Sequence, residues 1–553
     1  MRIQAMGGVA GRGPVPEGAL ATDDSEAPTA GRSDGFRMVS LGDGFTSGAQ
    51  DGVTVEARQQ KVYVKQLADH AGIRFNMPYL SGQGIPFGPF QGEDADSGQS
   101  QRQLLKLGVA VAPLALYTHF VGSPNWVVPV WEAVPDFGKR TLESRDTPEN
   151  PQSNFAMAGH ELRHLQDTHT MNDYLREVHQ GLEGLPSLTQ EVPLIRATLG
   201  NGKTAGNGSQ AEQAIAKDPH LAVIWAGNSD ALAGILSGRI DDAVLTPTED
   251  RQWVYQVANP ITGQTHTRVD EGPREGFRSQ LLGPYGLVGR MLRDTRAEIM
   301  LLNIPDVHVV PLLREVGKPV GDLPFRVVLK NGEDVTEELE TMVIPDQVAG
   351  TGAGGRTQFP PGTRVNLAVL VQKLTSTGAP RSREDLAARI ASQDALLGED
   401  DVLDPDELGT ISSRIASYNA AIEEAASLDG RVHVVDVHSA FNQARQEGRA
   451  LRGQGEDLTV GTGMTGALDE QGRDGLFSYD GVHPSDTGHA VVANLVLDKI
   501  KSDLAARPEF SAFQNLPPID EKAVYQADPH TSEQAVVVLD EASIDLWARG
   551  GRI

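Results

Sequence analysis

The stretch FRMVSLGDG, residues 36–44, decides the fold that we expect for the N-terminal part of the chain. Its apolar run stops at the turn residues Gly42, Asp43 and Gly44, and apolar residues with helical spacing follow at 59–68. A buried strand that leads through a tight turn into a helix is a building unit of α/β proteins. The sequence therefore predicts strand, turn and helix here.

Three further apolar runs predict more strands of the same kind. They lie at 221–226, 297–304 and 431–435, and helical segments at 211–217 and 405–427 precede the first and the last of them. Strands that are apolar along their whole length are buried on both faces, as in a parallel sheet covered by helices on each side. We expect a doubly wound α/β domain, with any active site outside the carboxyl ends of its strands.

The rest of the chain consists of extensions and insertions. Residues 1–35 are rich in Gly, Pro and Ala without periodicity, which predicts a disordered leader. The α/β domain is expected to span 36–507, with insertions at about 246–278 and 317–363, and an acidic C-terminal extension follows at 508–553.

Two segments predict additional β-structure outside the main sheet. Asn331-Gly332 is a hairpin signal between the apolar run 325–329 and the residues from Val335 onward. In the C-terminal extension, residues 534–539 (QAVVVL) predict an edge strand.

Composition limits the classes of function. The 553 residues carry 48 Lys and Arg against 75 Asp and Glu, and the net charge of −27 argues against a nucleic-acid partner. The 39% of apolar residues is enough for a sizeable core, and the absence of cysteine excludes disulfides and thiol catalysis. No apolar window predicts a transmembrane segment or a signal peptide, so we expect a cytoplasmic protein by default. The oligomeric state is not predicted.

The segment YDGVHPSDTGHAVVAN, residues 479–494, carries the clearest chemical pattern. Asp480 and His483 are three residues apart on one predicted loop, and Pro484 is expected to start the helix that anchors it. A carboxylate placed against the imidazole Nδ1 fixes the tautomer and leaves Nε2 as a general base. The alternative is a surface loop in which Asp480 only caps the turn.

Four segments in this order resemble the SGNH (GDSL-type) hydrolases. They are VSLGDGFTSGAQDG at 39–52, NFAMAGHEL at 154–162, IWAGNSDAL at 224–232, and the segment at 479–494. Each alone is weakly specific, whereas four in order are more so. The resemblance covers residues 37–501 and implies a three-layer α/β/α, flavodoxin-like fold with a five-stranded parallel sheet.

The resemblance also implies roles for individual residues. Asp480 and His483 match the catalytic Asp and His of the family, and Gly159 matches the glycine whose backbone N–H binds the oxyanion. Ser229 stands where the family has an oxyanion-binding Asn, and Asn228 lies one residue earlier. The implied activity is that of a lipase or esterase, which hydrolyses neutral acyl esters of small molecules or lipids without a cofactor.

The nucleophile position departs from the family pattern, because Gly44 stands where the family has its Ser. Removing a serine nucleophile from a triad costs on the order of a millionfold in rate. Ser47, one helical turn or roughly 5 Å further along, is a candidate substitute, and His483 activating water directly is another route. We therefore expect a hydrolase with impaired or unorthodox catalysis, or a non-catalytic ligand-binding relative (a pseudoenzyme).

A second motif predicts a different function. His160-Glu161-Leu162-Arg163-His164 is H-E-x-x-H, which on a helix places two imidazoles on one face to bind zinc, with the Glu as base. The motif makes a zinc metallopeptidase the lesser alternative. Candidate third ligands are His169, Glu177 and His179.

Four other residues are expected to have structural roles. Asp43 holds the first turn through hydrogen bonds to backbone amides, and Asp230 serves the turn of the third segment in the same way. Trp225 is expected in the core, and His489 is expected to pack or cap within the last long helix.

Overall fold

The computed structural model describes residues 35–80, 85–86, 152–167, 198, 208–258, 265–348, 358–375, 378–392, 397–469, 471–532 and 535–539. Apart from Gly35, the expected leader lies outside the described residues. Among the described residues, no helix combines the length and the apolar character needed to cross a membrane.

A parallel sheet of four strands forms the centre of the fold, in the order β1-β5-β8-β13. These strands are β1 (Met38–Gly42), β5 (Leu221–Trp225), β8 (Glu298–Leu302) and β13 (Val432–Val435). All three pairings are parallel, and every residue of the first three strands is buried. The predicted apolar runs are thus confirmed as the strands of a parallel α/β sheet.

A fifth segment, residues 153–157, runs parallel to β1 along its other edge. The Ser40 amide donates to the Ser153 carbonyl at 2.9 Å, and the Ser40 carbonyl accepts from the Phe155 amide at 2.9 Å. β1 therefore lies between this segment and β5, so its carboxyl end is an inner position of the sheet.

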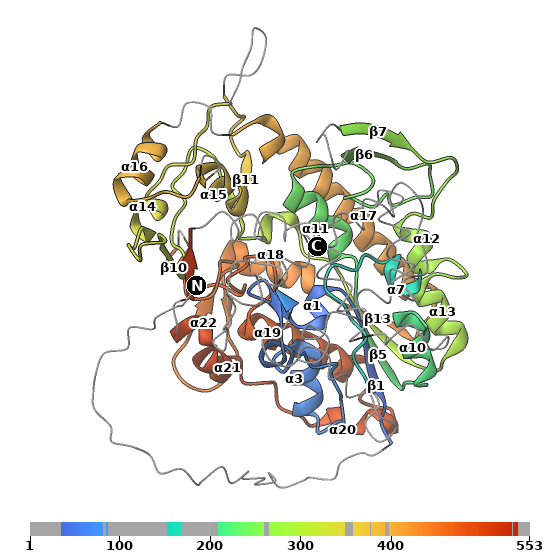
Figure 1. The fold of residues 1–553 in the computed structure, drawn as a ribbon. Helices are drawn as coiled ribbons and strands as arrows, with labels where there is room; N and C mark the ends of the chain where they lie inside the picture. The colour runs from blue at the N-terminus through green and yellow to red at the C-terminus, as the bar shows by residue number, and fades with distance from the viewer. Residues whose placement is uncertain are drawn as a thin grey trace, which may run out of the picture.

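Helices cover both faces of the sheet (Figure 1). On one face, α3 (Tyr63–His70) packs against α19 (Asp486–Asp503). The other face carries α10 (Gln210–Ala216), α11 (Asn228–Ser237), α12 (Phe277–Leu282), α13 (Leu287–Asp294) and α17 (Pro405–Leu428). Both α17 and α19 contact β13, so the edge strand is covered on each face.

Side-chain caps mark where the principal helices begin. Ser209 caps α10 and Asp404 caps α17, each in a capping box with the glutamate three residues further on. Ser485 caps α19, so this helix begins at Asp486 rather than at the expected Pro484.

The chain between β1 and α3 is more divided than the single predicted helix at 59–68. Its elements are α1 (Gly44–Ser47), β2 (Ala49–Gln50), β3 (Val53–Thr54) and α2 (Glu56–Gln59). Gly48, with a φ of 85°, ends α1 after one turn, because glycine adopts the left-handed conformation at no steric cost.

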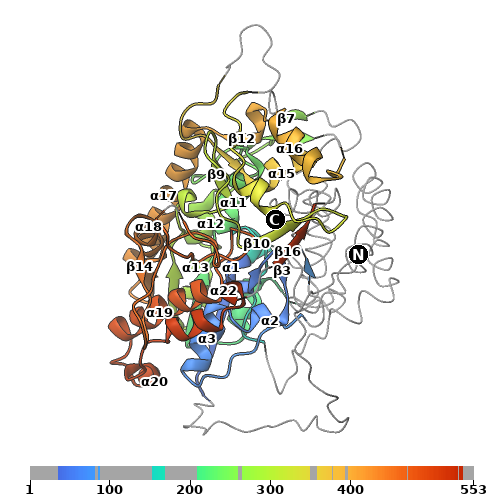
Figure 2. The same cartoon turned by 90° about the vertical axis from the view of Figure 1, so that its left-hand side faces the viewer.

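Both expected insertions contain β-structure. In the first, β6 (Val254–Ala258) and β7 (Thr265–Val269) form an antiparallel hairpin. In the second, the predicted turn at Asn331-Gly332 is present: Val328 and Asp334 form an antiparallel bridge, and the Leu329 amide donates to the Glu333 carbonyl at 2.8 Å. The second hairpin strand does not continue, because α14 (Thr336–Glu340) forms there, and β10 (Phe325–Val328) pairs in parallel with β16 (Ala535–Val538). The expected C-terminal edge strand is therefore present, and Figure 2 shows it beside β10.

The C-terminal residues pack onto the α/β domain. Helices α20 (Ser511–Gln514) and α21 (Glu521–Ala527) contact α19, and α22 (Pro529–Ser532) follows directly. The remaining elements are β4 (Ile85–Pro86), α7 (His164–Asp167), η2 (Val307–Val309), β9 (Leu313–Glu315), β11 (Arg364–Asn366), α15 (Leu367–Thr375), α16 (Arg383–Ala391), η3 (Glu399–Asp401), β12 (Val402–Leu403), α18 (Val437–Glu447), β14 (Arg449–Ala450), β15 (Thr459–Val460) and η4 (Pro508–Phe510).

Candidate active site

The first turn is built on a buried carboxylate at the carboxyl end of β1. Asp43 caps α1 by accepting a hydrogen bond from the Phe45 amide at 3.1 Å. Its Oδ2 also accepts from the backbone amides of Asn228 at 3.1 Å and Ser229 at 3.4 Å. Burial raises the pKa of Asp43 to about 6, against the lowering effect of these hydrogen bonds. The expected role of Asp43 as an acceptor for backbone amides is confirmed.

The same carboxylate engages the Asn228 side chain, whose Nδ2 donates to Asp43 Oδ2 at 3.1 Å. Asn228 thus joins the turn after β5 to the turn after β1. Ser229 lies at the same junction and is buried. Asn228 and Ser229 were both expected as oxyanion donors from this segment. The side-chain amide of Asn228 already donates to Asp43.

The second segment attaches to this junction through hydrogen bonds from both sides. Asn154 Nδ2 donates to the Thr46 carbonyl at 2.8 Å, and Asp230 Oδ2 accepts from the Leu162 amide at 2.8 Å. The Asp230 carboxylate therefore holds the second segment, rather than the turn of the third segment as expected. Gly159 lies in a turn between these two contacts, with a φ of 80°.

The fourth segment brings Asp480 and His483 into contact. His483 Nδ1 lies 2.9 Å from Asp480 Oδ2, and Asp480 Oδ1 accepts from the amides of Val482 and His483, each at 2.9 Å. Burial raises the pKa of Asp480, but the His483 imidazole and these hydrogen bonds outweigh it, so the net shift is downward. Because an ionised carboxylate only accepts hydrogen bonds, Nδ1 is the donor and the tautomer of His483 is fixed.

His483 also faces Gly44. A Cβ atom built on Gly44 would lie 2.4 Å from Nε2 and 3.1 Å from Cδ2 of the imidazole. The Phe45 ring packs against the same imidazole, with the ring centroids 5.2 Å apart. The structure thus places the expected base, its carboxylate and the expected nucleophile position in one cluster at the end of β1.

Ser47, the candidate substitute nucleophile, is turned toward its own helix. Its hydroxyl donates to the Gly44 carbonyl at 3.2 Å, and the residue is buried. The neighbouring Thr46 hydroxyl lies 3.1 Å from the Tyr63 hydroxyl. To react, Ser47 would have to give up its bond within α1.

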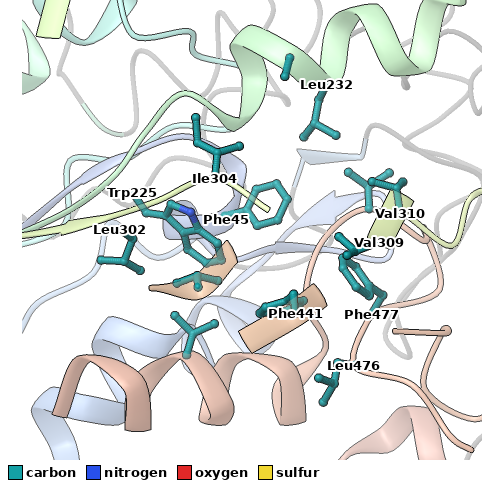
Figure 3. Close-up of a cluster of buried hydrophobic side chains, with 14 of the residues drawn as sticks. Phe45, Trp225, Leu232, Leu302, Ile304, Val309, Val310, Phe441, Leu476 and Phe477 are labelled. Atoms are coloured by element: carbon teal, nitrogen blue, oxygen red, sulfur yellow. The ribbon is translucent and has the colours of Figure 1, made fainter. Parts of the chain in front are cut away.

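Buried aromatic side chains pack against Phe45, which contacts the His483 imidazole. Trp225 packs edge-to-face on Phe45 with ring centroids 5.0 Å apart, and the two lie together in the buried cluster of Figure 3. Tyr63 packs on the other side of Trp225 and stacks on His489. Burial lowers the pKa of His489 to about 3, so this histidine is neutral. The expected core role of Trp225 and the packing role of His489 are confirmed.

The H-E-x-x-H motif does not have the helical geometry that zinc binding requires. Residues 160–163 lie in turns and irregular structure, and α7 begins only at His164. The His160 ring is packed edge-to-face on that of His164, and Glu161 forms an ion pair with Arg163 at 2.6 Å. No group of three or more potential metal ligands occurs in the part of the chain that the structure describes. The candidate third ligands lie outside that part.

Three residues near the site, Asp51, Gly52 and His530, were not selected from the sequence. Gly52 donates its amide to Asp480 Oδ2 at 3.1 Å, and the preceding Asp51 contacts the buried His530. The Asp-Gly pair was a visible turn signal, but His530 stands in the C-terminal extension without a recognisable motif. The comparisons with known proteins give no further guidance, because no family model, no curated protein and no solved structure matches this chain.

Proposed function

We propose that this chain is a carboxylic ester hydrolase of the SGNH type in which Gly44 replaces the nucleophilic serine. The observation that carries the proposal is the His483 imidazole, which Asp480 orients and which faces Gly44 at the carboxyl end of β1. A base at the carboxyl end of an inner parallel strand stands where α/β proteins place their active sites. The proposed substrates are neutral acyl esters of small molecules or lipids.

The strand order supports this assignment. With residues 153–157 beside β1, the order along the sheet is second segment, β1, β5, β8, β13. If residues 153–157 are counted as a strand, this order matches the 2-1-3-4-5 order of flavodoxin-like sheets, which supports the proposed resemblance to the SGNH hydrolases. The first three motif segments follow or flank strands of this sheet, and the fourth reaches the same end because His483 faces Gly44.

The proposed reaction uses water instead of a side-chain nucleophile. Gly44 has no oxygen that could form an acyl-enzyme, so His483 Nε2 takes a proton from a water molecule as the water oxygen attacks the ester carbon. The Asp480 carboxylate stabilises the resulting imidazolium, which then returns the proton to the leaving alkoxide. The proposed oxyanion donors are the Gly159 backbone amide and the Ser229 hydroxyl. The products are a carboxylic acid and an alcohol, formed on the order of a millionfold more slowly than by an intact triad.

The test compares ester hydrolysis by the native chain and by His483→Gln, using a short-chain nitrophenyl ester. Asp498→Asn, at an exposed position on α19, is the matched control. We expect slow hydrolysis by the native chain and by the control, and a rate equal to that of the buffer for His483→Gln. Equal rates for all three proteins would overturn the proposal.

A non-catalytic ester-binding site is the second candidate, and one observation favours it. Because a Cβ at Gly44 would lie 2.4 Å from Nε2, no water molecule fits between the Gly44 Cα and the imidazole. Saturable binding of the nitrophenyl ester, measured by calorimetry, without any His483-dependent turnover would identify this function.

A further inference from the structure

A buried charge cluster lies next to Asp480, centred on His530 in the C-terminal extension. His530 Nε2 lies 2.6 Å from Asp51 Oδ1, and His530 Nδ1 lies 2.5 Å from Asp528 Oδ1. His530 is completely buried, and Asp528 is as well. Because both ring nitrogens face carboxylates, both carry protons and the ring is an imidazolium.

On one side, the cluster is connected to the loop that carries Asp480. Asp51 Oδ1 accepts from the Tyr479 amide at 3.0 Å, and the Asp51 amide donates to the Ser478 hydroxyl at 3.2 Å. The next residue, Gly52, donates to Asp480 Oδ2 at 3.1 Å. Asp51 has a φ of 56°, in the left-handed region that few non-glycine residues adopt and that Asp adopts more often than most.

On the other side, the cluster is connected to the start of α19, just after His483. Asp528 Oδ2 accepts from both the amide and the hydroxyl of Thr487, at 2.9 Å and 2.8 Å. His530 therefore links the two ends of the chain segment 478–487, and the Asp480–His483 pair lies between these ends.

The balance of charge explains why a cation is needed at residue 530. Asp51, Asp528 and Asp486 are all buried. The basic groups that act on them are His530, Arg58, whose guanidinium forms an ion pair with Asp51 at 2.7 Å, and, at Asp486, Lys61. A neutral side chain at 530 would leave Asp51 and Asp528 buried without their shared partner, which is strongly unfavourable.

We propose that His530 is a positioning residue for the Asp480–His483 pair. Through Asp51 and Asp528 it fixes the loop so that Asp480 keeps the His483 imidazole directed at Gly44. The C-terminal extension is thereby part of the active site. The inference rests on the proposed function, in which His483 is the base, but its structural consequence is measurable without any activity.

The experiment observes the Nδ1 proton of His483 by NMR of the full chain with ¹⁵N-labelled histidine. His483→Gln assigns the signal, and exchange of this proton with water reports how well the bond to Asp480 is held. The test variant is His530→Gln. The control is Val537→Ala, which removes buried apolar contacts from β16 in the same C-terminal extension without touching the cluster.

We expect His530→Gln to accelerate the exchange by about tenfold or more, as for the loss of a hydrogen bond to a charged group, and Val537→Ala to change it by less than about twofold. Thr487→Val removes only the hydroxyl bond to Asp528, and we expect an acceleration of about threefold. If His530→Gln does not fold, the exchange rate in Thr487→Val tests the inference in its place.

An unchanged His483 signal in His530→Gln, or an equal effect of the control, would overturn the inference. If His530→Gln folds, an unchanged exchange rate in Thr487→Val assigns the coupling to the Asp51 side alone. If His530→Gln does not fold, an unchanged exchange rate in Thr487→Val overturns the inference. A native chain without ester hydrolysis but with the expected exchange rates would refute the proposed function and leave the positioning role of His530 established.

Discussion

The Gly52 amide donates to the same carboxylate oxygen, Oδ2 of Asp480, that holds the His483 imidazole, at distances of 3.1 Å and 2.9 Å. The orientation of the base is therefore set by the segment that follows the first turn, as well as by its own loop. A carboxylate with two or three such donors stays ionised and immobile. The predictions below concern the groups that converge on this oxygen and on the turns around it.

Asp480→Asn should abolish the function of His483 while leaving the chain folded. An asparagine side chain presents an amide to Nδ1 and reverses the tautomer, so we expect His483-dependent ester hydrolysis to fall by roughly a thousandfold to ten-thousandfold. Initial rates with the nitrophenyl ester measure this, with Asp498→Asn as the control. A loss of less than tenfold would show that Asp480 does not orient the base.

His530 should make the stability of the fold decrease at alkaline pH. Burial lowers its pKa, but Asp51 and Asp528 outweigh burial and raise it to about 10. A raised histidine pKa contributes stability that is complete below about pH 6.5 and is lost as the pH rises through 10. We expect the free energy of unfolding to fall by up to about 1.4 kcal/mol per pH unit between pH 8 and 9.5.

Urea unfolding at several pH values checks this slope. The interval lies above the pKa values of about 6, 7 and 6 for the buried carboxyls Asp43, Asp230 and Asp486, so these groups do not contribute to it. His530→Gln should be less stable by about 3–5 kcal/mol at neutral pH, since it breaks a buried ion cluster, and should lose the slope. A slope that persists in His530→Gln would assign it to other groups.

Asp43→Ala should loosen the junction between the first and third motif segments. It removes the acceptor of the Asn228 side chain and of two backbone amides there, and an unpaired buried donor costs about 1–3 kcal/mol. Urea unfolding at pH 7.5, where the carboxylate is ionised, measures the loss, and Asp69→Ala at an exposed position is the control. Equal stability of both variants would contradict the role given to Asp43.

Metal removal should leave the protein unaffected. Because residues 160–163 are not helical, His160 and His164 are not held one turn apart on a helix. We expect dialysis against a chelator to change neither the unfolding midpoint nor the rate of ester hydrolysis. Activity lost on chelation and restored by zinc would reinstate the metallopeptidase alternative.

The sequence predicted the features that depend on neighbouring residues. The strands at the centre of the sheet are continuous apolar runs, because both of their faces are covered. Asp480 and His483 could be paired because they are three residues apart on one loop. The absence of a side chain at Gly44 was equally visible.

Contacts between distant parts of the chain could not be predicted in this way. The turn expected at Asn331-Gly332 is present, but the strand that pairs along the whole of β10 is the C-terminal β16, more than 200 positions later. His530 and Asp51 are 479 positions apart, and nothing local to either residue indicates the other. The short helix α1, which Gly48 ends after one turn, required the backbone geometry itself.

Gly44→Ser tests the central claim most directly, because it restores the oxygen that the site lacks. Its Cβ requires the His483 imidazole, which Asp480 and Phe45 hold, to shift away from residue 44, and the new hydroxyl then lies beside Nε2. The measurement is the intact mass after reaction with a fluorophosphonate. We predict no adduct on the native chain, one adduct at residue 44 of Gly44→Ser, and none on Gly44→Ser combined with His483→Gln. An adduct on the native chain, or none on a folded Gly44→Ser, would contradict the account.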